Sequence, residues 1–199
     1  MKKTTNQRIL MLAWAVLMVL PMALLTSCSE SDEEITEFDN WQERNDTYFN
    51  EVYNRAKSSS TGEWKVFTQW SLNEEMATKA EDHIVVQVLE TGTSSGCPIF
   101  TDSVSIHYSG RLMPSASYPE GYEFDKSWSG TFNAATSKPY SGSVNSFVDG
   151  FTTALQNMHV GDHWRVYIPY RLGYGSSSGS IPAYSTLIFD LRLVAYYKP

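Results

Sequence analysis

The stretch "FVDGFTTALQNMHVGDHWRVYIPYRLGYG", residues 147–175, decides the fold because its hydrophobic period changes halfway along. Its first part has apolar residues at helical spacing, with Phe151, Leu155 and Met158 on one face. Asp149 stands just before this face and is the expected N-cap. Gly161 then predicts a turn, after which alternation at residues 164, 166 and 168 predicts a strand.

The sequence on both sides of this stretch is rich in strand patterns. In Ser103–Leu112, apolar residues alternate with polar ones, which predicts a strand with one buried face. There is no internal repeat and no alternation of strands with helices. We therefore expect an α+β fold in which an antiparallel sheet wraps around one short helix. The other expected strands lie in residues 64–72, 83–92, 121–128 and 185–197.

A second helix is expected near the start of the chain, from Phe38 to Lys57, as an N-terminal appendage. Its apolar face is predicted to carry Phe38, Trp41, Tyr48, Val52 and Ala56. Such a face packs on the following domain, the commoner outcome, or pairs with a second copy of the chain as a homodimer. The sequence leaves both alternatives open.

The first 27 residues have the features of a secretory signal peptide. Basic residues are followed by an uncharged apolar run, residues 9–25, and then by small residues. A transmembrane anchor is the alternative, but a span needs about 20 residues and Pro21 interrupts this run. We expect a signal peptide at 1–27, an acidic tether at 28–37, a helical segment at 38–82 and the main domain at 83–199.

The charge of the chain limits its partners. Without residues 1–27 it has 12 Lys and Arg against 22 Asp and Glu, a net charge of −10. Such a chain repels nucleic acid and anionic membrane surfaces, so electrostatic binding to either is not expected.

The two cysteines have different expected fates. "LTSC", residues 25–28, resembles the lipobox of bacterial lipoproteins, which implies lipidation of Cys28 and attachment to the cell envelope. The acidic stretch after it resembles those that route some Bacteroidetes lipoproteins to the cell surface. Cys97 is left without a partner, so no structural disulfide is expected. No basic neighbour in sequence predicts a reactive thiol there.

Two motifs suggest enzyme chemistry, and neither has the context it needs. Ser177 lies in a G-x-S-x-G pattern, but a hydrolase elbow leads into a helix, whereas Ile181-Pro182 and a strand follow here. His159 and His163 have the spacing of metal ligands on a helix, yet Gly161 breaks that geometry and no third ligand is placed. We therefore expect no metal and no cofactor, and two histidines at the surface or a strand end.

Read together, "VSIHYSGRL", "EFDKSW", the stretch 147–175 and "IPAYSTLIFDLRL" strongly resemble the FKBP-type peptidyl-prolyl isomerases. The resemblance covers residues 84–197 in order. It implies a half-wrapped antiparallel sheet around one short helix, and an aromatic pocket that binds proline. The implied pocket residues are Tyr108, Phe124, Asp125, Phe147, Val148, Phe151, Tyr174, Ile181 and Phe189.

The resemblance also implies roles for these residues. Phe151 would form the pocket floor, Tyr108, Phe124 and Phe189 its walls, and Phe147 with Val148 one rim. The Val148 N–H and the Tyr174 hydroxyl would bind carbonyl groups of the peptide, with Ile181 at the mouth. Asp125 would accept a hydrogen bond from Tyr108.

The sequence departs from the family pattern at several places. Phe151 replaces the usual tryptophan, and Phe147 replaces a β-branched aliphatic residue. The segment between Tyr108 and Phe124 is longer than in compact members, and residues 175–181 form a short, serine-rich loop. Tyr140 stays outside the assigned set.

The expected function is peptidyl-prolyl cis-trans isomerisation of exported proteins by a lipid-anchored envelope protein. Such an enzyme needs no nucleophile, metal or redox cofactor, because the reaction is a bond rotation. The alternative is a non-catalytic chaperone or surface-complex subunit that binds prolyl peptides on the same fold.

Overall fold

The computed structural model describes residues 37–177 and 179–199. The signal peptide, Cys28 and all but the last residue of the expected tether lie outside the described residues. The elements, in chain order, are α2 (Trp41–Ser58), β1 (Trp64–Thr68), η1 (Ala80–Asp82), β2 (His83–Glu90), β3 (Ser103–Leu112), β4 (Glu123–Lys126), β5 (Tyr140–Ser143), η2 (Val144–Ser146), α3 (Asp149–Leu155), β6 (His163–Ile168), η3 (Tyr170–Leu172) and β7 (Leu187–Tyr197).

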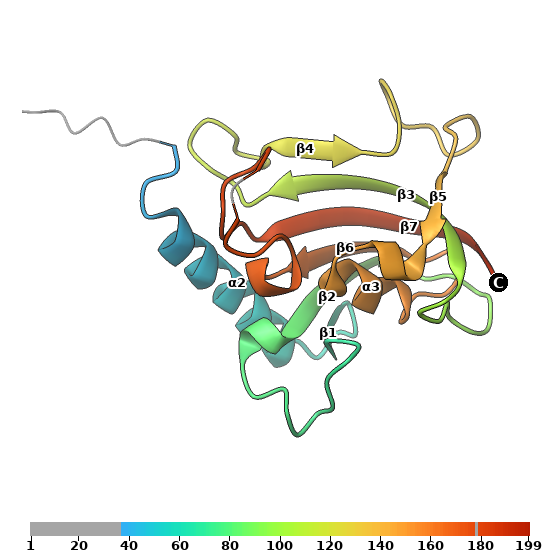
Figure 1. Cartoon of the computed structure of the whole chain (residues 1–199), viewed down its shortest axis with the longest axis horizontal. Helices are drawn as coiled ribbons and strands as arrows, with labels where there is room; N and C mark the ends of the chain where they lie inside the picture. Colours follow the sequence, from blue (N-terminus) through green and yellow to red (C-terminus); the bar gives the residue numbers. More distant parts are fainter. Residues whose placement is uncertain (1–36, 178) are drawn as a thin grey trace, which may run out of the picture. The chain divides into compact units, whose positions relative to one another are not determined.

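The strands form one antiparallel sheet in the order β1-β2-β6-β7-β3-β4, and β5 pairs with β3 outside this path. In Figure 1 this order runs from β4 at the top to β1 at the bottom. The central strands β3 and β7 pair along their whole length, from Ser103–Tyr197 to Leu112–Leu187. The predicted α+β fold, with one sheet and one short helix against it, is confirmed.

The core lies between α3 and the face of the sheet that it covers. Leu155 and Met158 are fully buried there against inward residues of the strands, as their helical spacing predicts. Burying one such side chain contributes about 1.5–3 kcal/mol. Gly150 allows the close approach of α3, because a Cβ at this position would lie 2.3 Å from a methyl carbon of Ile168.

The opposite face of the sheet is partly covered by α2. Phe49, Val52 and Ala56 form a second apolar cluster with Val85 of β2 and Tyr167 of β6. The apolar face of α2 thus packs on the chain's own sheet, which is the first of the two expected alternatives.

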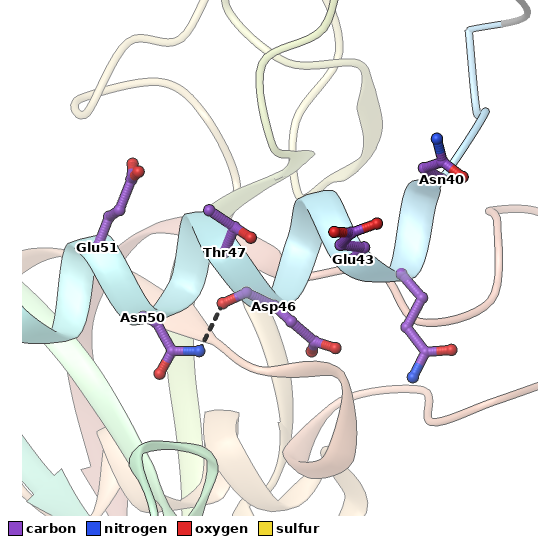
Figure 2. A pocket seen from close by; sticks show the side chains of 7 residues that line it. Asn40, Glu43, Asp46, Thr47, Asn50 and Glu51 are labelled. Atoms are coloured by element: carbon purple, nitrogen blue, oxygen red, sulfur yellow. Dashed lines mark hydrogen bonds between the residues drawn. The ribbon is translucent and has the colours of Figure 1, made fainter.

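The predicted face of this helix was wrong in two details. Phe38 precedes the helix and is exposed, whereas Phe49, which the prediction left out, is 3% exposed. Buried Asn45 also lies on the inner face, where it bonds to the chain before β7. Figure 2 shows the polar residues of α2, which include Thr47 and Asn50 and border a shallow, open surface.

Two further local predictions need correction. Val148 is the N-cap of α3, and Asp149 is the first helical residue, where its carboxylate accepts a hydrogen bond from the Trp70 indole at 3.2 Å. The strand β3 is largely buried on both faces rather than one. Its outer residue His107 is 4% exposed because the Phe132 ring packs edge-on against it, with centroids 5.0 Å apart.

Among the described residues, no helix has the length and apolar character needed to cross a membrane.

Candidate functional site

Four aromatic rings meet at one end of the core, and each comes from a different element. Tyr108 lies on β3, Phe124 on β4, Phe151 on α3 and Phe189 on β7. Phe189 is the hub of the group: its ring centroid lies 4.9 Å from Phe151, 5.7 Å from Phe124 and 6.1 Å from Tyr108. All three contacts are edge-to-face, a favoured geometry for aromatic pairs. We call these four residues the aromatic cluster.

The aromatic cluster depends on a glycine in β3. Gly110 pairs with Phe189 across the strands, and a Cβ on Gly110 would lie 2.6 Å from the Phe189 ring and 2.7 Å from the Phe124 ring. The missing side chain therefore leaves the space in which the two rings meet.

A hydrogen bond fixes one wall of the cluster. The Tyr108 hydroxyl donates to Oδ2 of Asp125 over 2.8 Å. Burial of the ring and this hydrogen bond both raise the pKa of Tyr108 well above its ordinary value. The hydroxyl therefore remains protonated and keeps donating at neutral pH.

A cavity of about 360 Å³ lies beside the cluster. It offers an aromatic wall, a carboxylate and a phenol hydroxyl to an incoming ligand. Tyr174, which is 51% exposed, stands at its mouth, and partial burial together with the charge of Asp125 raises the pKa of this phenol. The cavity is lined by Phe124, Asp125, Tyr174, Ser177, Gly179, Ser180 and Ile181.

Ser177 lies on the rim of this cavity, but its surroundings are not those of a nucleophile elbow. The chain turns at Gly175, with φ of 70°, and then leads through Ile181 to the strand β7. Within residues 179–199 no helix follows the serine. The local structure is therefore consistent with the short, serine-rich loop expected at residues 175–181, and this loop borders the cavity.

Phe147 and Val148, the expected rim residues, do not line this cavity. The Phe147 ring stacks on the Phe151 ring, with centroids 4.7 Å apart and planes inclined by 19°. Phe151 is 3% exposed as a result of its neighbours. Phe147 and Val148 are half-buried against the core at the start of α3. The structure thus brings the five predicted aromatic residues Tyr108, Phe124, Phe147, Phe151 and Phe189 into one group of ring contacts, while the predicted residues Asp125, Tyr174 and Ile181 line the adjacent cavity.

Tyr140 was left outside the predicted set, yet it borders the site. Its ring lies 6.1 Å from both Tyr108 and Phe147, in edge-on contacts, and its side chain is 44% exposed. It lies on β5, a strand that the sequence did not predict. The only signal for it was an aromatic residue placed shortly before Phe147.

The histidines lie away from this site, and His159 and His163 lie at the surface and at a strand end, as expected. His163 is buried at the start of β6 and bonds to the carboxylates of Glu90 and Asp190. His159 lies with Nε2 3.8 Å from the sulfur of Cys97, a neighbour that the sequence order did not reveal. Burial nevertheless raises the pKa of the Cys97 thiol, as does the charge of Asp162. In the part of the chain that the structure describes, no side-chain group suits a metal ion.

Within the residues that the structure describes, Cys97 forms no disulfide.

Comparisons with known proteins agree with the geometry. Residues 98–194 match the family model described as FKBP-type peptidyl-prolyl cis-trans isomerase. The chain is 34% identical to the macrophage infectivity potentiator of Trypanosoma cruzi over 133 aligned residues. The aligned segment covers 66% of this chain and 62% of that protein. The chain is 31% identical over 131 residues to the outer membrane protein MIP of Legionella longbeachae, covering 61% and 51%. The chain therefore spans little more than half the length of these relatives.

A solved structure has the same fold. The crystal structure of FkpA from Escherichia coli superposes with a TM-score of 0.57 at 22% identity, covering 100% of this chain and 74% of that one. Through residues 98–194, this chain belongs to the family of FKBP-type peptidyl-prolyl cis-trans isomerases.

Proposed function

We propose that this chain is a peptidyl-prolyl cis-trans isomerase that acts on X-Pro bonds of exported proteins. The observation that carries the proposal is the aromatic cluster, with the cavity of Phe124, Tyr174 and Ile181 beside it. The family match of residues 98–194 supports the same activity.

The chemistry of such a site follows from the peptide bond. Rotation about X-Pro takes tens to hundreds of seconds because amide resonance must be broken. In the twisted transition state the carbonyl loses resonance and becomes less polar. A site that binds the twisted form more tightly than either planar form lowers the barrier, and each tenfold acceleration requires about 1.4 kcal/mol of this difference.

In this proposal the residues have distinct parts. Phe151 is the floor for the prolyl ring, and Tyr108, Phe124 and Phe189 are the walls. Asp125 holds the Tyr108 wall through its hydrogen bond. The Tyr174 hydroxyl and the Val148 N–H bind carbonyl oxygens of the peptide, while Phe147 and Ile181 border the entrance.

The location we propose is the cell envelope, with a lipid on Cys28 after removal of residues 1–27. The basic start, the apolar run and "LTSC" support it, and one relative is named an outer membrane protein. Residues 28–37 would be the tether, 38–82 a helical segment and 83–199 the isomerase domain. Clients are proline-containing polypeptides. We do not include a homodimer through α2, because its apolar face contacts the chain's own sheet.

The test is an isomerisation assay by NMR exchange on the peptide Ala-Leu-Pro-Phe, using the full chain in mild detergent. We expect cis-trans exchange well above the rate in buffer. Phe124→Ala, which removes a wall, should lower kcat/KM about tenfold or more, since large aromatic truncations at binding centres cost about 2 kcal/mol or more. Phe38→Ala, outside the site, is the control. Exchange equal to that in buffer, with a folded chain, would exclude the activity.

One observation favours a second function. Phe147 covers the Phe151 floor, so the chain as it stands has a filled prolyl site. A chaperone that holds prolyl segments at the outer cavity, without seating the proline ring on Phe151, would bind them without turnover. Suppression of aggregation of an unfolded client, without acceleration of exchange, would select this alternative.

A further inference from the structure

Phe147 covers one face of the Phe151 ring. Tyr108 and Phe189 contact the Phe151 ring with planes inclined by 84° and 88°, so neither of them stacks on it. Of the three rings around Phe151, only Phe147 lies parallel to it, at 4.7 Å. The Phe147 side chain therefore stands where a ring bound on Phe151 would lie.

The lining of the cavity beside the cluster is consistent with this stacking. The cavity is lined by Phe124, Tyr174 and Ile181, whereas Phe151 does not line it. A peptide that enters from solvent meets the outer wall first. Phe151 is 3% exposed and offers that peptide little surface while the Phe147 ring is stacked on it.

The other ring in contact with Phe147 belongs to an exposed side chain, which can change its rotamer. Besides Phe151, the Phe147 ring touches Tyr140 of β5, an edge-on contact with centroids 6.1 Å apart. Tyr140 is 44% exposed, and exposed side chains change rotamer within picoseconds to nanoseconds. Phe147 itself is half-buried and follows the short helix η2. The Phe147 ring is thus only partly buried against the core and contacts one buried ring and one exposed ring.

We infer that Phe147 is an autoinhibitory gate, whose ring competes with the prolyl ring of a substrate for the face of Phe151. The inference rests on the proposed function, since it assigns the Phe151 face to proline. A site that is open for only a fraction of the time binds its ligand more weakly by that fraction. Given the strength of an aromatic stack, the gate reduces the affinity about two- to tenfold.

The experiment measures binding of Ala-Leu-Pro-Phe by NMR titration to the full chain in mild detergent. The chains compared are the wild type, Phe147→Val, Phe147→Leu and the distal control Phe38→Val. We expect Phe147→Val to lower the dissociation constant about two- to tenfold, Phe147→Leu to lower it less, and Phe38→Val to leave it unchanged. Near-UV circular dichroism and the Tm verify that each variant is folded.

The outcomes separate the gate from the proposed activity. Equal or weaker binding by both folded Phe147 variants would show that this ring assists binding, and would overturn the gate. Binding that tightens in Phe147→Val while neither chain accelerates exchange would support the gate and refute isomerisation. Absence of binding by Phe147→Val would overturn the gate whatever the wild type does.

Discussion

Tyr108 and Asp125, on the adjacent strands β3 and β4, are joined by a hydrogen bond of 2.8 Å from the phenol to the carboxylate. The tyrosine ring also lies edge-on to Phe151 and Phe189. The bond therefore fixes a ring that two other members of the aromatic cluster contact. It couples a polar residue at the edge of the site to the apolar surface at its centre.

Asp125→Ala should lower kcat/KM about tenfold or more, because a hydrogen bond to a charged group contributes about 1.5–3 kcal/mol. The Tyr108 wall then loses its anchor. Asp125→Asn keeps an acceptor oxygen and should retain most of the activity. Measurement of Tyr108→Phe and of the double variant completes a cycle: effects that simply add would contradict a role of Asp125 through Tyr108.

Tyr174→Phe should reduce kcat/KM about two- to tenfold, since one neutral hydrogen bond contributes about 0.5–1.5 kcal/mol. The side chain is half exposed, so the free energy of unfolding should change by less than about 0.5 kcal/mol. Exchange NMR and denaturant titration give the two values. Tyr184→Phe is a matched control, because Tyr184 contacts Tyr170 and does not line the cavity. An unchanged kcat/KM in Tyr174→Phe would remove this hydroxyl from the site.

The sequence was sufficient to predict the helices and strands that have a strong hydrophobic pattern. The change of period after Gly161 predicted both α3 and β6, and the strand β7 was evident from its own alternation. The strand β5, "YSGS", has no such pattern: it is short and polar, and its pairing with β3 defines it. Strands of this kind arise from tertiary contact and leave no local signal.

For the site, residue identities could be predicted but the conformations could not. The order of aromatic residues was sufficient to place Tyr108, Phe124 and Phe189 in one group. The stacking of Phe147 on Phe151 depends on a side-chain rotamer, which the sequence pattern does not specify. The pairing of His163 with Glu90 and Asp190 likewise depends on the order β2-β6-β7 in the sheet.

The ionisation of Asp190 should make the free energy of unfolding depend on pH in the acidic range. Its burial opposes ionisation, but the hydrogen bond with His163, the charge of that residue and those of Arg165 and Arg192 outweigh it, so the pKa is lowered. A lowered pKa in the folded state stabilises the fold above the unfolded value of about 3.9. This contribution is lost as the pH falls through the lower, folded value.

Asp190→Asn should therefore lower the free energy of unfolding at neutral pH by about 1–2 kcal/mol. Its difference from the wild type should begin to shrink below about pH 4 and close as the pH falls through the lower, folded pKa, where the carboxylate of the folded wild type becomes neutral. Denaturant titrations over a pH series measure it, with Glu43→Gln on the polar side of α2 as the control. A gap that stays constant down to the lowest pH would show that shape rather than charge is responsible.

Asn45 is the polar residue that fixes α2 to the rest of the chain. It is fully buried; its amide donates to the Trp41 carbonyl over 2.7 Å, and its oxygen accepts from the Thr186 N–H over 2.7 Å. The Trp41 indole donates to Ser185 next to it. These bonds join the helix to the segment that enters β7.

Asn45→Ala should lower the free energy of unfolding by about 2–3 kcal/mol, because the buried Thr186 N–H loses its partner. The matched control is Asn50→Ala on the polar side of the same helix, where the amide bonds only to the Asp46 carbonyl (Figure 2). It should change the free energy by less than about 0.5 kcal/mol. Denaturant unfolding of the two variants decides the matter. Equal and small effects would mean that the apolar contacts of Phe49 and Val52 alone hold α2 in place, whereas the expected difference makes Asn45 a specific link between the N-terminal helix and the sheet.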